Sequence, residues 1–291
     1  MRWEGQRQSD NVEDRRAGGG GGGGLGFGGR SIGIGTIVIA LLGGWIFGIN
    51  PLTIIGMLSG GGGPAVVQQA PAARPPQGDQ QAAFVSTVLA NTEDVWGQIF
   101  QQGGARYANP KLVLFRGATP TACGTGQSAM GPFYCPGDQK LYLDMGFFDT
   151  LRTQLGAPGQ FAQAYVIAHE VGHHVQNLLG MTDKVDSMRG RISQAQQNAL
   201  SVRLELQADC YAGIWAHHSQ QSKQWLDPGD IEAAMNAAEK IGDDALQKRS
   251  QGYAVPDSFT HGSSTQRQRW FAQGFKTGSV QACDTFSAQA L

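Results

Sequence analysis

Two histidines and one glutamate in the stretch AYVIAHEVGHHVQ, residues 164–176, have the types and spacing of a catalytic metal site. His169 and His173 are four residues apart, so a helix projects both imidazoles from one face, about one turn apart. Both rings can then reach one zinc ion at about 2 Å from each nitrogen. Glu170 would face a metal-bound water and act as its general base, as in the H-E-x-x-H pattern. The competing interpretation is a helix that tolerates polar residues on one face.

A catalytic zinc site needs a third protein ligand and an open fourth position. An extended motif ending in a third histidine requires glycine at 176 and histidine at 179, but the residues are Gln176 and Leu179. The stretch RLELQADCYAG instead offers Glu205 and Asp209 on one helical face. We expect Glu205 to be the third metal ligand and Asp209 to accept a ring N–H from a ligand histidine. The alternative is a solvated helix edge, which their mostly apolar neighbours disfavour.

Peptide hydrolysis also requires a group that stabilises the developing oxyanion. His261, in FTHGSS, is the first candidate for this catalytic role, and Tyr134 and Tyr165 are the next candidates. The alternative for His261 is a loop histidine near a helix N-terminus. His174 points about 100° away from His173 on the helix. We therefore expect His174 to pack or hydrogen-bond beside the site.

The elements that must position these residues are mostly helical. The histidines lie in a predicted helix from about 160 to 179, which Gly180 ends. Glu205 and Asp209 lie in a further helix, in one or two pieces, over 201–218. Other helices are predicted from near Gln80, at 145–154, after Asp227 as N-cap and Pro228, and near 264–275, with strands at 111–115 and 140–144. Helices with a small sheet make the domain α+β. The strand at 140–144 is either a sheet edge open to an extended peptide or an ordinary core strand.

Charge and cysteine content narrow the class of protein. The net charge is −1, from 22 basic and 23 acidic residues, and the C-terminal part has no basic block, so a nucleic-acid partner is not expected. The four cysteines are scattered, without a C-x-x-C pair, which favours two disulfides in an oxidising compartment. Of the three connectivities, we favour Cys123–Cys135, which leaves Cys210–Cys283. A buried free thiol at Cys210 is the alternative.

The first eighty residues differ in composition from the rest. Residues 1–30 are charged and then glycine-rich, which predicts a flexible cytoplasmic tail. Residues 31–58 contain no charge and are long enough for one transmembrane helix, and 59–79 form a Gly, Pro and Gln linker. More arginines precede the span than follow it, so we expect a single-pass membrane protein with its N-terminus in the cytoplasm. The catalytic domain, 80–291, would then be periplasmic or extracellular.

Five separated motifs give the chain a family resemblance: AYVIAHEVGHHVQ, ELQADCYAGIWA, GPFYCPGDQKLYLD, DSFTHGSSTQRQRWF and a C-terminal CDTF. This set resembles the bacterial neutral zinc metallopeptidases, membrane-anchored proteins of the glutamate-zincin type, over essentially the whole chain. It is also similar, more distantly, to membrane zincins whose second motif is E-x-x-x-D, matched by Glu205 and Asp209. The resemblance implies a peptidase but supplies no substrate.

The leading hypothesis is a membrane-anchored zinc endopeptidase that hydrolyses peptide bonds in peptide or protein substrates. Zn²⁺ would be the cofactor and Glu170 the general base. A second hypothesis is a zinc-stabilised binding or scaffold protein of the cell envelope without turnover. The intact Glu170 argues against it, because a structural zinc site needs no base. A third is a domain in which the motif is accidental.

Overall fold

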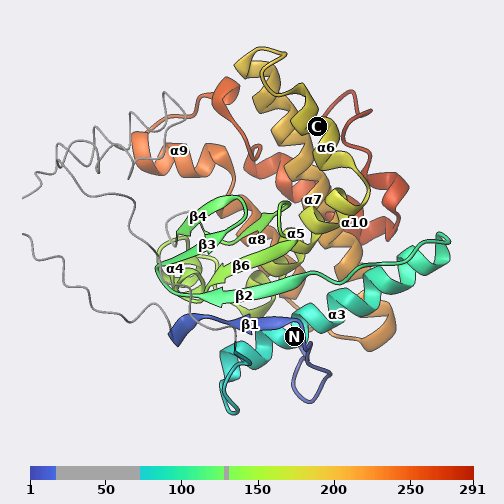
Figure 1. The fold of residues 1–291 in the computed structure, drawn as a ribbon. Helices are drawn as coiled ribbons and strands as arrows, with labels where there is room; N and C mark the ends of the chain where they lie inside the picture. The colour runs from blue at the N-terminus through green and yellow to red at the C-terminus, as the bar shows by residue number, and fades with distance from the viewer. Residues whose placement is uncertain (18–72, 128–130) are drawn as a thin grey trace, which may run out of the picture. The chain divides into compact units, whose positions relative to one another are not determined.

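The structure is a computed structural model that describes residues 1–17, 73–127 and 131–291 (Figure 1). The described residues fall into one compact unit. The expected transmembrane helix at 31–58 lies outside them, as does most of the linker at 59–79. Among the helices that the structure describes, none combines the length and the apolar character that crossing a bilayer requires.

The larger sheet of the described chain has the strand order β1-β2-β6-β5. Its strands are β1 (Val12–Asp14), β2 (Lys111–Phe115), β6 (Lys140–Asp144) and β5 (Phe133–Cys135). The pairs β1–β2 and β2–β6 are parallel, whereas β5 runs antiparallel to β6. A separate antiparallel pair is formed by β3 (Ala118–Thr121) and β4 (Gly124–Gln127). The strand at 140–144 is therefore an interior strand, and β5 forms the edge.

Side chains alternate across this sheet as the period of a strand requires. Leu112 pairs with Leu141 and Leu114 with Leu143, and all four belong to the main hydrophobic core. Val113, Phe115 and Tyr142 face the other way and form a smaller buried cluster. Both faces of β2 and β6 are thus covered, which explains their nearly continuous apolar sequences.

Helices make up most of the described chain and confirm the α+β prediction (Figure 1). They are α3 (Gln80–Gln102), α4 (Gly146–Thr153), α5 (Gln160–Leu178), α6 (Met181–Met188), α7 (Gln194–Lys223), α8 (Asp230–Lys240), α9 (Asp243–Gln251) and α10 (Ser264–Thr277), with 3-10 turns η3 (Pro256–Ser258) and η4 (Val280–Cys283). The helix predicted over 201–218 is one piece, since Ser193 and Gln196 form a capping box that starts α7 well upstream. The expected N-cap at Asp227 is wrong, because α8 begins after Gly229.

Close approach of helices packs both α5 and α10 directly against α7. A Cβ on Gly172 of α5 would lie 3.0 Å from the backbone oxygen of Ala208 on α7. Gly213 of α7 and Gly274 of α10 meet the backbone of the opposite helix, and neither has room for a Cβ. Two helices approach this closely only where the residues at the contact have no side chain or a very small one. The helices that carry the histidines and the carboxylates are therefore held in direct backbone contact.

The N-terminal residues 1–17 are part of this fold, which corrects the expectation of a flexible tail there. β1 pairs in parallel with β2, and Trp3 is buried against Phe84. Asp14 forms a β-bridge with Ala73 through two backbone hydrogen bonds. The expected domain start near Gln80 is thus too late.

This pairing also constrains membrane topology. Residues 12–14 and 112–114 are neighbours in one sheet, and residues 1–17 belong to the same compact unit as the domain. A single crossing at 31–58 with a cytoplasmic N-terminus would separate these two parts of the sheet. The predicted orientation, with the N-terminus and the domain on opposite sides, stays a prediction, and the pairing of β1 with β2 argues against it.

Both predicted disulfides are present. Cys123 and Cys135 close a short loop before β6, and Cys210 and Cys283 join α7 to η4. All four cysteines are paired, so the free-thiol alternative for Cys210 is excluded. The second bridge spans 73 residues and fixes the C-terminal segment to the middle of α7.

Candidate metal centre

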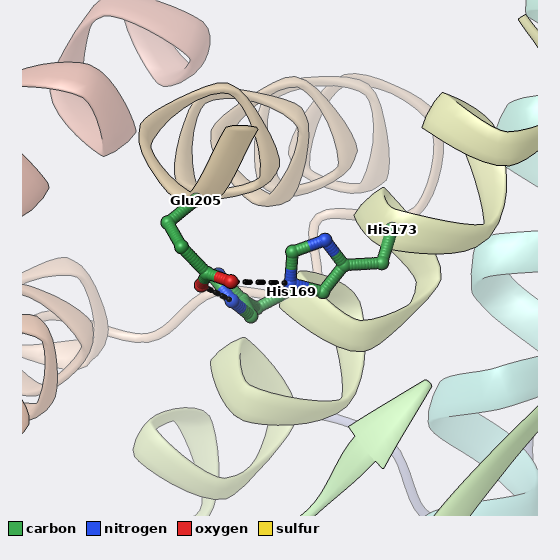
Figure 2. A group of neighbouring side chains, drawn as sticks. All are labelled: His169, His173 and Glu205. Atoms are coloured by element: carbon green, nitrogen blue, oxygen red, sulfur yellow. Dashed lines mark hydrogen bonds and ion pairs between the residues drawn. The ribbon is translucent and has the colours of Figure 1, made fainter. Parts of the chain in front are cut away.

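The helix pair α5 and α7 brings together three side chains able to bind a metal ion (Figure 2). His169 and His173 project from consecutive turns of α5, and Glu205 reaches toward them from α7. Their possible ligand atoms all lie within 4.8 Å of one another. Both histidine side chains are buried to more than four-fifths, and so is that of Glu205. The sequence prediction that these three residues meet is confirmed.

The distances suit a tetrahedral zinc ion. Glu205 Oε2 lies 3.1 Å from His169 Nε2, and Oε1 lies 3.4 Å from His173 Nε2. Two ligand atoms that are each about 2 Å from a tetrahedral ion are separated by about 3.3 Å. Two imidazoles and one carboxylate are also a donor set of catalytic zinc sites, which leave the fourth position open. The residues present therefore fit the metal.

The electrostatics of the site favour a cation. Burial lowers the pKa of His169, but the carboxylates of Asp209 and Glu205 outweigh burial and raise it to about 10. The pKa of His173 is raised as well, because the charge of Glu205 exceeds the effect of burial. For Glu205, burial raises the pKa, yet the charges of His173 and His261 hold it well below its usual range. The carboxylates thus create a negative potential that a divalent cation would neutralise.

Asp209 orients the first histidine, as the sequence predicts. Its Oδ1 lies 2.8 Å from His169 Nδ1, which assigns the ring proton to Nδ1 and leaves Nε2 free to bind metal. Tyr165 donates to the same oxygen at 2.5 Å. Arg267 of α10 donates to both carboxylate oxygens, each at 2.9 Å, and is 3% exposed. Asp209 is therefore a fully paired buried carboxylate.

The second histidine is oriented by Gln176, which no ligand motif in the sequence singles out. Its Oε1 lies 2.8 Å from His173 Nδ1. The amide nitrogen of Gln176 donates to the carbonyl of Leu204 at 2.6 Å and to Gln207. The rotamer of Gln176 is thus fixed by α7, and His173, like His169, presents Nε2 to Glu205.

Glu170 lies in the first turn of the motif and is 9% exposed. Its charge is close enough to His173 to contribute to raising the pKa of that ring. Among the described residues its carboxylate takes part in no side-chain hydrogen bond or ion pair, in contrast with Glu205 and Asp209. The geometry is compatible with a carboxylate that accepts a proton beside the three ligands.

His261 follows α9 and η3 and lies near the site. Its side chain is 53% exposed, and Nδ1 lies 3.3 Å from Asp243 Oδ1. The other oxygen of Asp243 accepts the backbone N–H groups of Thr260, His261 and Gly262 at 2.7, 2.7 and 3.0 Å. Burial disfavours the charged ring, but the charges of Glu205 and Asp243 raise the pKa of His261. His261 is therefore a loop histidine just before the N-terminus of α10, close enough to Glu205 for their charges to interact, and its catalytic role stays a prediction.

The tyrosine candidates for oxyanion stabilisation are engaged elsewhere. The Tyr165 hydroxyl is buried and bonded to Asp209. The Tyr134 hydroxyl lies 3.0 Å from His174 Nδ1 and accepts a hydrogen bond from Asn177 at 3.1 Å. His174 also donates from Nε2 to the carbonyl of Ala108, so it packs beside the site as expected. Of the three candidates, His261 alone retains an exposed ring.

Comparison with known proteins agrees with this geometry. Residues 1–286 match the family described as "Putative neutral zinc metallopeptidase". The chain belongs to this family. The membership supports a zinc-dependent peptidase as the general class and implies peptide or protein substrates.

The relatives include proteins of Escherichia coli and Mycobacterium tuberculosis. "Uncharacterized protein YpfJ" of Escherichia coli (strain K12) is 51% identical over 291 residues, covering 98% of this chain and 99% of that protein. "Uncharacterized protein Rv2575" of Mycobacterium tuberculosis (strain ATCC 25618 / H37Rv) is 47% identical over 197 residues, covering 64% of this chain and 65% of that protein. No solved structure matches the chain significantly.

Proposed function

We propose that this protein is a zinc-dependent peptidase that hydrolyses peptide bonds with Glu170 as general base. The observation that carries the proposal is the convergence of His169, His173 and Glu205 within 4.8 Å, with the charge of Glu170 close to His173. A purely structural zinc site is closed by four protein ligands and needs no base. Three ligands and a neighbouring carboxylate therefore favour hydrolysis over a scaffold role.

His169, His173 and Glu205 would hold the zinc ion, which would supply a Lewis acid and lower the pKa of a bound water toward neutrality. Glu170 then takes the proton of the attacking water and passes it to the amine that leaves. Asp209, itself held by Arg267 and Tyr165, keeps the proton of His169 on Nδ1. His261 donates a hydrogen bond to the oxyanion, with Asp243 at its other ring nitrogen.

We also propose that the domain works outside the cytoplasm. Two disulfides, one of them linking α7 to η4, support an oxidising compartment. The proposal places residues 1–17 on the same outer side, because β1 and β2 share a sheet. The uncharged segment at 31–58 supports attachment to the membrane.

The function is tested with the full chain purified in detergent. We expect about one zinc per chain by elemental analysis and cleavage of a mixed peptide library read by mass spectrometry. Glu170→Gln should keep the zinc and lose the cleavage, because only the base is removed. His169→Ala should lose both the zinc and the cleavage.

The matched control is His218→Ala. His218 lies near the end of α7 and hydrogen-bonds to the carbonyl of Gly278, so the variant should keep both the zinc and the cleavage. Unchanged cleavage by Glu170→Gln would exclude the proposed function.

A further inference from the structure

A cavity of about 460 Å³ lies alongside the helix that carries Glu205. Its volume falls within the roughly 300–1,000 Å³ typical of small-ligand sites. One wall is the first half of α7, through Ala195, Ala199 and Val202, and the opposite wall is η3 and the residues after it, through Pro256 and Phe259. The cavity is therefore bounded by two segments that lead along the chain to Glu205 and to His261.

The position of the cavity relative to the metal ligands follows from the helix period. Asn198, Val202 and Glu205 are spaced by four and three residues, so they lie on one face of α7. Phe259 is two residues before His261 on the opposite wall. The residue after His261, Gly262, packs against α7, since a Cβ at Gly262 would lie 3.3 Å from Val202 Cγ1. The cavity thus begins about one helical turn from Glu205.

Six of the eleven residues that line the cavity are apolar, and most of the polar ones are engaged within the protein. Ser263 and Gln266 hydrogen-bond to each other at the start of α10. The guanidinium of Arg203, which also lines the cavity, donates to the carbonyls of Thr285, Phe286 and Ala288. The amide of Asn198 donates to the Asp257 carbonyl at 3.0 Å. These polar groups are occupied by the protein, whereas alanine, valine, proline and phenylalanine side chains remain to contact a ligand.

We propose that this cavity is the subsite that binds an apolar side chain of the substrate next to the scissile bond. The inference rests on the proposed function for the identity of the ligand as a peptide. Burial of a leucine or phenylalanine side chain against apolar walls lowers the free energy of binding, whereas a polar side chain would lose hydrogen bonds to water without replacing them. The exposed Asp257 at the rim makes a basic side chain the competing occupant.

Binding is measured separately from turnover, with the full chain carrying Glu170→Gln and loaded with zinc. The probes are blocked peptides Ala-Xaa-Ala in which Xaa is leucine, phenylalanine, serine or lysine, titrated by calorimetry or NMR. We expect the leucine and phenylalanine peptides to bind about tenfold or more tightly than the serine peptide. Ala199→Trp should remove this difference, because the indole fills the cavity from an exposed position on α7. Ser222→Trp, exposed near the far end of α7, is the matched control and should preserve it.

Three results overturn the subsite: equal affinity for the four peptides, tightest binding of the lysine peptide, or an unchanged preference in Ala199→Trp. Thermal unfolding of both tryptophan variants checks that each is folded, and Ala195→Phe gives a second way to fill the cavity. If the apolar preference is found but the unsubstituted protein cleaves no peptide, the subsite stands and the proposed peptidase activity fails.

Discussion

At the scale of single residues, the site depends on contacts to three helices. His169 lies on α5, its partner Asp209 on α7, and Arg267, which holds Asp209, on α10. A buried carboxylate is stable only when it is paired and hydrogen-bonded. The arginine therefore sustains the charge that in turn fixes the tautomer of the ligand histidine.

We predict that replacing Arg267 weakens both folding and metal binding. Arg267→Met leaves Asp209 without its counter-charge and should lower the free energy of unfolding by about 3–5 kcal/mol. Arg267→Lys keeps a positive charge but loses the two parallel hydrogen bonds. The Arg267→Lys protein should still fold. Its zinc affinity should be about 10–100 times lower, which is the usual effect of losing a group that orients a metal ligand. Chelator competition measures the affinity.

The matched control is Arg269→Met, which changes an exposed arginine on the same helix. It should leave zinc affinity unchanged. A folded Arg267→Lys protein with the zinc affinity of the unsubstituted chain would show that Arg267 does not act through His169.

At the scale of elements, glycines determine how closely α7 and α10 pack. A Cβ at Gly274 would clash with the backbone carbonyl of Cys210, whereas one at Gly97 of α3 meets nothing within 4 Å. We predict that Gly274→Ala lowers the free energy of unfolding by about 3 kcal/mol or more, because overpacking must move a backbone. Gly97→Ala should raise it by up to about 1 kcal/mol through helix propensity. Urea unfolding of the two variants measures both changes, and equal effects would refute this account of the packing.

The docking of β1 should depend on pH through Glu13. Its side chain is 14% exposed and accepts hydrogen bonds from Lys140 and Arg15 at 3.0 and 2.8 Å. Burial raises the pKa of Glu13, but these hydrogen bonds outweigh burial and lower it to about 2. A lowered pKa in the folded state stabilises the protein above the unfolded value of 4.5. That stabilisation is lost as the pH falls from 4.5 toward 2.

We therefore predict that Glu13→Gln is less stable than the unsubstituted protein by roughly 2 kcal/mol at pH 7. The difference should shrink steadily below pH 4.5. Metal-free protein is used throughout, so that loss of zinc does not contribute. Glu232→Gln, at an exposed position of α8, is the control and should differ little from the unsubstituted protein at either pH. A difference that persists unchanged at pH 2.5 would contradict the role of Glu13.

At the scale of the whole molecule, residues 1–17 and 73–291 form one body. We predict that both parts are exposed on the outer side of the cell. Single cysteines at the exposed positions Glu4 and Asp183 should both react with a membrane-impermeant maleimide in intact cells. Labelling at Asp183→Cys but not at Glu4→Cys, with both labelled after permeabilisation, would restore the orientation first expected from the arginine distribution.

Local sequence was sufficient wherever a single helix or loop sets the geometry. The four-residue spacing places His169 and His173 on one face whatever surrounds the helix, and Gly180 ends that helix with a φ of 72°. Glu205 and Asp209 were found in the same way, because carboxylates among apolar residues of a helix need partners. Four cysteines limit the disulfides to three pairings.

Tertiary structure decided what depends on segments far apart in the chain. Arg267 is 58 residues from Asp209, and nothing in its local sequence distinguishes it from the exposed Arg269. The arginine-rich start reads as a flexible tail because the partners of β1, such as Leu112, come a hundred residues later. Periodicity describes contacts within about one helical turn or along one strand. Which helices pack together, and which cavity forms between them, depends on long-range packing that no local pattern encodes.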